Sequence, residues 1–418
     1  MRNKKLLAIF IAAVMCLGVL AGCNSGTPVD NPGVQDNPEV EDNSGETETL
    51  SDPEDSGEPE PEPAPEVASF RELTANELMV EMGAGWNLGN TMDSVPSIRG
   101  MPAQQETGWG NPTTTPEMIQ LLKDTGFGTL RIPVTWHVFI GPEPDYSVAD
   151  AMLDRVQEIV DYGIERDMYV IINMHHENWL YPSEENFEPA KAKLTTAWAQ
   201  IAERFGGYSE KLIFEAMNEP RMIGNELEWR GGDETARDVI NKWNAAFVEA
   251  IRATGGNNAK RWLMVPTIAA SGDYPALRGF VMPDDDNVIV SIHAYVPNNL
   301  ALRQRNSQKT FDPENTSNTY DIDDLFKRLN EYFLSKGYPV VMGEMGIVNK
   351  ENLDDRVRWT TYYGELAAAN NVPCIWWDNG ILYNTNNESF GIMDRREVEW
   401  WFPEIAEALV AAMATMDN

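Results

Sequence analysis

Residues 212–220 read LIFEAMNEP, an apolar run that ends in the polar triplet Asn218-Glu219-Pro220. A short continuous apolar run is typical of a parallel strand that is buried on both faces. The same order recurs along the chain from about residue 70, where apolar runs end in polar residues and are followed by helical stretches. Strands separated by helices predict a parallel sheet covered on both sides.

Eight strands are predicted, at Gly83–Leu88, Thr129–Val134, Met168–Met174, Leu212–Met217, Trp262–Pro266, Val288–His293, Val340–Gly343 and Pro373–Trp377. The helical stretches between and after them are Ala149–Asp167, Ala190–Phe205, Glu234–Thr254, Ile322–Lys336, Asp354–Asn370 and Pro403–Met413. This alternation predicts an α/β fold, a (β/α)8 TIM barrel over residues 70–418. The alternative is an open doubly wound sheet, which requires G-x-G-x-x-G after the first strand, whereas residues 85–90 read GWNLGN.

Ionisable and aromatic residues stand where the predicted strands end: Arg131, His175-His176-Glu177, Asn218-Glu219-Pro220, His293-Ala294-Tyr295, Gly343-Glu344 and Trp376-Trp377-Asp378. In a barrel these ends meet at one mouth, so Glu219 and Glu344 are expected to face each other. Cleavage of a glycosidic bond uses two carboxyl groups, and net retention requires them about 5–5.5 Å apart. The pair predicts Glu219 as acid/base and Glu344 as nucleophile.

The neighbouring polar residues are expected to support these two carboxylates. Asn218 is a candidate to hold a sugar hydroxyl, and Arg131 to lie against Glu344 and keep it ionised. His293 and Tyr295 are two residues apart, hence on one face of an extended segment, where they can bond to Glu219 and Glu344 respectively. Glu215, inside the fourth strand, is interpreted as a paired carboxylate of the barrel interior.

The formal net charge of −34 argues against nucleic acid and anionic lipid as partners, because phosphate groups need a basic surface. A neutral, hydroxyl-rich substrate is compatible with this charge. The chain has four histidines, and His175-His176-Glu177 lacks the i, i+4 spacing of a helical zinc site, so no catalytic metal is expected. Helical Trp198 and Trp243 are predicted to lie in the core.

The N-terminal segment 1–23 has the features of a signal peptide that ends in a lipobox. Arg2, Lys4 and Lys5 precede the apolar run Leu6–Leu20, and Leu20-Ala21-Gly22-Cys23 follows. Lipidation of Cys23 would anchor the chain to the membrane; the alternative is an ordinary signal peptide. Residues 24–69 contain 14 Asp and Glu, 8 Pro and no Lys or Arg, so this segment is predicted to be a disordered linker. Cys374 then remains alone, without a disulfide partner.

Together these motifs resemble glycoside hydrolase family 5. The resemblance rests on Leu130–Val134, Asn218-Glu219-Pro220, His293-Ala294-Tyr295, Gly343–Gly346 and Trp376–Gly380. The opening Gly85–Asp93 and His175-His176-Glu177 are similar to the endoglucanases of its subfamily 4. The family implies a (β/α)8 barrel, a retaining mechanism and no cofactor. Its eight hallmark residues fall on Arg131, His175, Asn218, Glu219, His293, Tyr295, Glu344 and Trp377.

Two of these assignments select one residue of an adjacent pair, namely His175 over His176 and Trp377 over Trp376. The resemblance also implies a cis peptide bond at Trp377–Asp378. His176, Asn87, Trp109 and Trp179 are further candidates for binding substrate or supporting the site; for Trp109 and Trp179, stacking on a sugar and structural packing stay equally open. Asp378 is expected at the rim of the site.

The resulting hypothesis is a retaining endo-β-1,4-glucanase acting on cellulose, mixed-linkage glucan or xyloglucan. Alternatives are a xyloglucan-specific endoglucanase or a β-mannanase of the same family and, from a different class, a surface glycan-binding lipoprotein without activity. The expected partner is a β-1,4-glucan. Family resemblance and the tether favour a monomer that is held at the extracellular face of the membrane by Cys23 or is secreted.

Overall fold

The computed structural model describes residues 69–95, 100–383 and 388–417. The predicted signal segment 1–23, with Cys23, and the predicted linker 24–69 lie outside these residues, apart from Ser69. Within the described ranges, no helix combines the length and the apolar character that crossing a bilayer requires.

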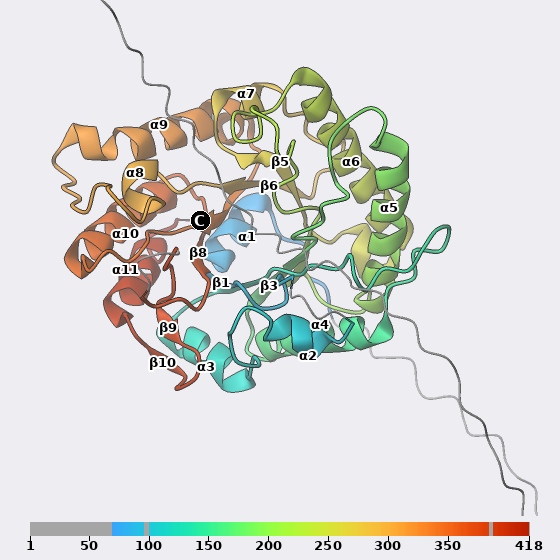
Figure 1. The fold of residues 1–418 in the computed structure, drawn as a ribbon, viewed down its shortest axis with the longest axis horizontal. Helices are drawn as coiled ribbons and strands as arrows, with labels where there is room; N and C mark the ends of the chain where they lie inside the picture. Colours follow the sequence, from blue (N-terminus) through green and yellow to red (C-terminus); the bar gives the residue numbers. More distant parts are fainter. Residues whose placement is uncertain (1–68, 96–99, 384–387, 418) are drawn as a thin grey trace, which may run out of the picture. The chain divides into compact units, whose positions relative to one another are not determined.

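Eight parallel strands close into a barrel in which each strand pairs with the next and β8 pairs with β1 (Figure 1). They are β1 (Ala84–Leu88), β2 (Thr129–Ile132), β3 (Tyr169–Asn173), β4 (Leu212–Glu215), β5 (Leu263–Ser271), β6 (Val288–His293), β7 (Val340–Met345) and β8 (Cys374–Asp378). The predicted (β/α)8 fold is thereby confirmed. Strand β5 runs five residues beyond its predicted end, through an irregular pairing with β6 between Pro266 and Ser271.

Helices surround this barrel (Figure 1). They are α1 (Ala75–Met82), α2 (Pro102–Glu106), α3 (Pro116–Thr125), α4 (Asp150–Ile164), α5 (Phe187–Arg204), α6 (Glu234–Ala253), α7 (Tyr274–Arg278), α8 (Asn298–Ala301), α9 (Thr316–Tyr332), α10 (Leu353–Ala368) and α11 (Pro403–Met413). Short 3-10 turns lie at η1 (Gly256–Ala259) and η2 (Leu334–Lys336), and β9 (Met393–Asp394) pairs with β10 (Glu399–Trp400).

Helix α6 shows how the sequence builds this outer layer. The Asp233 side chain accepts a hydrogen bond from the Ala236 amide and thereby caps the first turn. The helix buries Trp243, Phe247 and Ile251 on the side that faces the barrel. Trp198 on α5 is also fully buried, so the predicted core positions of Trp198 and Trp243 are confirmed.

Helix α1 covers the N-terminal end of the barrel, opposite the predicted site (Figure 1). A reciprocal pair of hydrogen bonds between Thr74 and Glu77 starts the helix. At its end the Thr129 hydroxyl, at the start of β2, donates to the Met82 carbonyl at 2.7 Å. Because this end is closed by protein, substrate can reach the polar strand ends only from the other side.

Two expectations about β8 are wrong. The Trp377–Asp378 peptide is trans, since the cis bonds of the described residues are Glu143–Pro144 and Val296–Pro297. Strand pairing explains this result, because Asp378 pairs with Leu88 on β1 and its carbonyl accepts from the Gly89 amide at 3.0 Å. Nor does Asp378 lie at the rim. Its fully buried carboxylate accepts hydrogen bonds from Trp86 and Arg395.

Candidate active site

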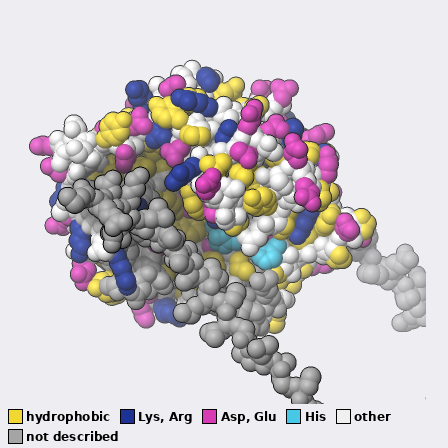
Figure 2. All heavy atoms as spheres, turned by 45° about the horizontal axis from the view of Figure 1, so that its top comes forward, with side chains coloured by type: hydrophobic (Ala, Val, Ile, Leu, Met, Phe, Trp, Pro, Cys, Tyr) yellow, Lys and Arg dark blue, Asp and Glu magenta, His cyan; other side chains and the backbone are white. Residues whose placement is uncertain are grey.

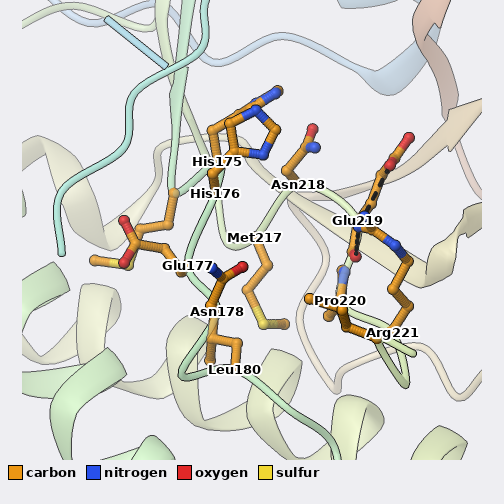
Figure 3. A pocket seen from close by; sticks show the side chains of 12 residues that line it. His175, His176, Glu177, Asn178, Leu180, Met217, Asn218, Glu219, Pro220 and Arg221 are labelled. Atoms are coloured by element: carbon orange, nitrogen blue, oxygen red, sulfur yellow. Dashed lines mark hydrogen bonds and ion pairs between the residues drawn. The ribbon is translucent and has the colours of Figure 1, made fainter. Parts of the chain in front are cut away.

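The C-terminal strand ends bring the two predicted carboxylates together. Glu219 and Glu344 each place one carboxylate oxygen within 4.8 Å of the other and of a His293 ring nitrogen. This separation fits the short spacing of retaining glycosidases, about 5–5.5 Å between carboxyl groups, and leaves no room for the water that an inverting enzyme places between them. Figure 3 shows Asn218 and Glu219 beside His175 and His176, around a pocket at the ends of β3 and β4.

Glu344 lies on β7 with only 7% of its side chain exposed. Its oxygens accept hydrogen bonds from Arg131 at 3.0 Å and from the Tyr295 hydroxyl at 2.8 Å. Burial raises the pKa of Glu344, while the charges of His293 and Arg131 and the bond from Tyr295 oppose that rise. These contacts favour an ionised Glu344, the form that a nucleophile needs.

Arg131 on β2 is fully buried and organises the floor of the site. Its guanidinium also donates to Glu215 at 2.7 Å, to Asn87 at 2.8 Å and to the Asn218 side-chain oxygen at 2.8 Å. Glu215 accepts a further bond from Ser291 at 2.7 Å, which confirms it as a paired carboxylate of the barrel interior. Asn87 is fully buried, so it supports Arg131 and lies away from the substrate-accessible surface.

Glu219 and His293 form the second half of the site. His293 Nδ1 lies 2.9 Å from a Glu219 oxygen, as predicted, and 17% of the Glu219 side chain is exposed. Burial disfavours the charged form of both groups. At His293 the charge of Glu344 and the contact with Glu219 outweigh the effect of burial, and at Glu219 the contact with His293 does so. The pKa of His293 is therefore raised and that of Glu219 lowered. Their contact at 2.9 Å provides a path by which a proton can pass between the two side chains.

Trp377 and His175 form an aromatic wall beside this pair. Their rings are parallel, with an interplanar angle of 1° and centroids 5.8 Å apart. Burial lowers the pKa of His175 well below its ordinary value, so its ring is neutral. A Cβ on Gly89 would lie 2.8 Å from the Trp377 indole, so glycine is required for this close approach. Trp376 is fully buried, which favours Trp377 as the wall of the site.

The remaining aromatic candidates lie farther out. Trp109 is 44% exposed, and its ring centroid is 5.7 Å from that of His176, which lines the pocket. The Trp179 indole donates to Glu177, and the Lys193 ammonium lies 4.5 Å from its ring centroid and covers one face. Sugar stacking by these residues stays a prediction. In Figure 2 histidine side chains lie beside hydrophobic ones on one face of the molecule.

Three charged residues that the structure brings to the site had no role predicted for them. Buried Glu177 accepts hydrogen bonds from the Trp136 and His137 amides and fixes the loop after β2. Asp93 accepts from the amides of Asn90 and Thr91. Arg221 lies 3.6 Å from the Glu219 carboxylate. Arg221 directly follows the triplet Asn218-Glu219-Pro220 in the sequence. Its position next to the predicted acid is the signal that could have identified it.

Among the described residues, two groups of three place possible metal-ligand atoms within 4.8 Å of one another. One is Asp93, His175 and His176, and the other is Glu219, His293 and Glu344. The second group is engaged by hydrogen bonds between its own members and from Arg131 and Tyr295. Acid–base and nucleophilic chemistry can therefore proceed from the side chains themselves.

Comparison with known proteins adds independent findings. Residues 89–383 match the cellulase family, glycosyl hydrolase family 5. Endoglucanase A of Clostridium longisporum is 44% identical over 353 residues, covering 82% of this chain and 66% of that protein. Endoglucanase 1 of Ruminococcus albus is 45% identical over 339 residues, covering 80% of each chain.

The solved structure of a GH5-4 broad specificity endoglucanase from Ruminococcus champanellensis, with bound cellotriose, superimposes with a TM-score of 0.79. Its sequence is 43% identical, and the match covers 82% of this chain and 100% of that one. Residues 89–383, which match the family, contain Glu219, Glu344 and every strand of the barrel from β2 to β8. The chain therefore belongs to glycosyl hydrolase family 5, the cellulases.

Proposed function

We propose that this protein is a retaining endo-β-1,4-glucanase that cleaves internal bonds of β-1,4-linked glucans. The observation that carries the proposal is the close approach of Glu219 and Glu344, with Arg131 and Tyr295 on Glu344 and His293 on Glu219. The cellotriose held by the related R. champanellensis enzyme supports a β-1,4-linked glucose chain as the substrate class.

The first step forms a covalent bond between the enzyme and the sugar. A carboxylate oxygen of Glu344 attacks the anomeric carbon while the bond from that carbon to the departing oxygen breaks. The proton shared by Glu219 and His293 passes through Glu219 to this oxygen, and the shortened chain leaves with a free hydroxyl. The side-chain oxygen of Asn218 accepts a hydrogen bond from Arg131 at 2.8 Å. In this mechanism Asn218 binds the hydroxyl beside the reacting carbon.

The second step releases the sugar. Formation of the ester removes the charge of Glu344, so Glu219 becomes free to accept a proton from a water molecule. The water oxygen bonds to the anomeric carbon as the ester bond breaks, and Glu344 leaves as a carboxylate. Two inversions give net retention, and the Glu219–His293 pair regains its proton.

Product analysis on a panel of polysaccharides tests this proposal. Carboxymethyl-cellulose, barley glucan, xyloglucan and glucomannan are incubated with wild type and with Glu344→Gln, and viscosity and reducing ends are followed. We expect wild type to lower the viscosity of the glucans early, before many reducing ends appear. Activity confined to mannose-linked bonds would favour a mannanase, cleavage of xyloglucan alone would favour a xyloglucanase, and binding without cleavage would favour the glycan-binding alternative.

The pH dependence follows from the shared proton. Glu344 must be ionised, so activity is lost as the pH falls through its raised pKa. The Glu219–His293 pair must be protonated, and activity is lost as the pH rises through the raised pKa of His293. We expect a bell-shaped profile of kcat/KM on barley glucan whose two limbs belong to the coupled groups. A rate that keeps rising through the alkaline limb would contradict the shared acid.

Removal of divalent ions is expected to leave the rate unchanged. The proton donor and the nucleophile are both side chains, and no step above requires a Lewis acid. Hydrolysis of barley glucan is measured after incubation with excess EDTA and dialysis, with a buffer-treated sample as the control. Loss of activity on chelation, with recovery when a divalent ion is added, would show that the mechanism is incomplete.

We further infer that Cys23 is lipidated and holds the enzyme outside the cell through the linker 24–69. The sequence Leu20-Ala21-Gly22-Cys23 after an apolar run supports this inference. Cys23→Ser is expected to release the protein from the membrane fraction or to leave it unprocessed, while Cys16→Ser, which changes a residue of the removed segment, stays anchored. Mass spectrometry of the mature N-terminus measures the lipid. Wild type found only in the culture fluid, beginning at another residue, would overturn the assignment.

A further inference from the structure

The side chain of Asn173, the last residue of β3, contacts the ring of His175 two positions later. Asn173 is fully buried, and its Nδ2 lies 3.2 Å from Nδ1 of His175. His175 in turn lines the pocket at the ends of β3 and β4 (Figure 3). The mechanism proposed above gives Asn173 no part, yet its amide is the hydrogen-bond partner of a ring that forms the wall of the site.

A backbone amide fixes which way the Asn173 side chain faces. The Val134 N–H group donates to one end of the side-chain amide at 3.0 Å. Because an N–H group can only donate, the atom that faces Val134 must be the oxygen, Oδ1. The other end of the amide, which faces His175, is therefore the NH2 group.

This orientation of Asn173 decides where His175 carries its proton. The NH2 group can only donate, so Nδ1 of His175 must accept and carries no proton. The assignment follows from the hydrogen-bond partners. It excludes an imidazolium, which has protons on both nitrogens, and it places the single proton of a neutral ring at Nε2. Burial lowers the pKa of His175 well below its ordinary value, in agreement with a neutral ring.

The Nε2–H group of His175 lies on the side of Asp93. Asp93 Oδ2 is 4.0 Å from Nε2, which is beyond hydrogen-bond distance, and both Asp93 oxygens already accept from the amides of Thr91 and Asn90. Among the described residues, the His175 side chain makes its hydrogen bond through Nδ1, so the Nε2–H group stays available to a ligand. A proton at Nε2 also leaves that atom no lone pair for a metal ion, so it cannot serve the group Asp93, His175 and His176 as a ligand.

The ligand that this donor fits is a hydroxyl oxygen of the sugar held at the Trp377 wall. The ring of His175 is parallel to the Trp377 indole, with centroids 5.8 Å apart, so its edge lies beside a sugar that packs on this indole. A hydroxyl oxygen can accept from Nε2–H. With the proton at Nδ1 instead, Nε2 would offer a lone pair, and the polarity of this contact would be reversed.

We propose that Asn173 is a positioning residue that keeps Nδ1 of His175 unprotonated, so that His175 presents an N–H donor at Nε2 to a hydroxyl of the sugar under attack. The proposal rests on the proposed glucanase function and deepens it. Asn173 is buried and does not touch the sugar, so it acts only through His175. The Val134 amide, the Asn173 side chain and the His175 ring form one chain of donors that ends at the substrate.

NMR of the protein labelled with 15N-histidine reads this tautomer directly. The chain has four histidines, so His175→Gln identifies the His175 signals by their loss. Long-range 1H–15N spectra distinguish a ring nitrogen that carries a proton from one that does not. We expect wild-type His175 to carry its proton at Nε2. In Asn173→Asp we expect a proton at Nδ1, because the carboxylate accepts where the amide donated. Asn76→Asp, an exposed position on α1, is the matched control and should keep the wild-type spectrum and rate.

Hydrolysis of barley glucan shows whether Asn173 acts through His175. Asn173→Asp should lower kcat/KM by about tenfold, the size expected for one hydrogen-bond donor. His175→Gln keeps an N–H donor on its side-chain amide but has no tautomers. In the His175→Gln background, Asn173→Asp should therefore change kcat/KM by less than about twofold, because the two changes share one interaction. Thermal unfolding of each variant shows that the barrel is intact.

Two outcomes would overturn this proposal while leaving the glucanase function intact. One is a wild-type His175 that carries its proton at Nδ1, or an Nδ1 that stays unprotonated in Asn173→Asp. The other is an equal loss of kcat/KM by Asn173→Asp in the wild-type and His175→Gln backgrounds. The spectra are recorded without substrate, so absence of wild-type hydrolysis on every glucan would instead refute the proposed function, and the two failures are distinguishable.

Discussion

Replacing Glu344 by glutamine is expected to lower hydrolysis of barley glucan by at least about a thousandfold, which corresponds to about 4 kcal/mol of transition-state stabilisation. The amide keeps the shape of the side chain but cannot form the ester with the anomeric carbon. Arg131 retains its second carboxylate partner, Glu215 at 2.7 Å, so the barrel floor should stay folded.

The measurement is the initial rate of reducing-end release, together with thermal unfolding of each variant. Glu404→Gln, which changes an exposed glutamate on α11, is the matched control and should equal wild type. A Glu344→Gln protein that is folded and keeps more than about a tenth of the rate, a loss of less than about 1.4 kcal/mol, would show that another group is the nucleophile.

Glu219→Gln should produce the second-largest effect, and this effect should depend on the leaving group. General acid catalysis contributes about 10²–10⁴-fold, so polymer hydrolysis should fall by that amount. A dinitrophenyl cellobioside should lose much less in the step that forms the glycosyl-enzyme, since its leaving group departs without a proton. Azide should restore turnover as an anionic nucleophile that needs no base.

Burst kinetics with the dinitrophenyl substrate measure the two steps separately. An initial burst followed by slow release is expected for Glu219→Gln, because the proposed mechanism assigns both the acid and the base roles to this residue. An equal loss on polymer and on the activated substrate, without a burst and without rescue by azide, would remove Glu219 from the acid/base role.

The barrel could be predicted because each strand has a local sequence signal. Apolar runs such as Leu212–Glu215 end in polar residues, and the helices between them carry an amphipathic pattern. The predicted contacts of Arg131, His293 and Tyr295 with the two carboxylates were confirmed, because all of these residues stand at strand ends that a closed barrel brings together. Helices α1 and α3 were missed; α1 precedes the first strand, whereas α3 occupies the place between β1 and β2 that the alternation provides for a helix.

What the sequence could not show depends on contacts between distant residues. The buried position of Asp378 is set by Trp86, 292 residues earlier in the chain, and by Arg395, which lies in the turn between β9 and β10. The role of Asn87 as a buried support for Arg131 depends likewise on the meeting of β1 and β2. The contact between Arg221 and Trp229 is set by a loop whose path no local periodicity specifies.

The anomeric configuration of the first product tests the central claim most directly. Proton NMR spectra are recorded within minutes of mixing wild type with cellohexaose, before the anomers of the new reducing end interconvert. Double displacement at Glu344 predicts that the β-anomer signal appears first and that the α-anomer signal grows later by mutarotation. An α-anomer signal that appears first would mean a single inversion by water and would contradict the covalent role of Glu344.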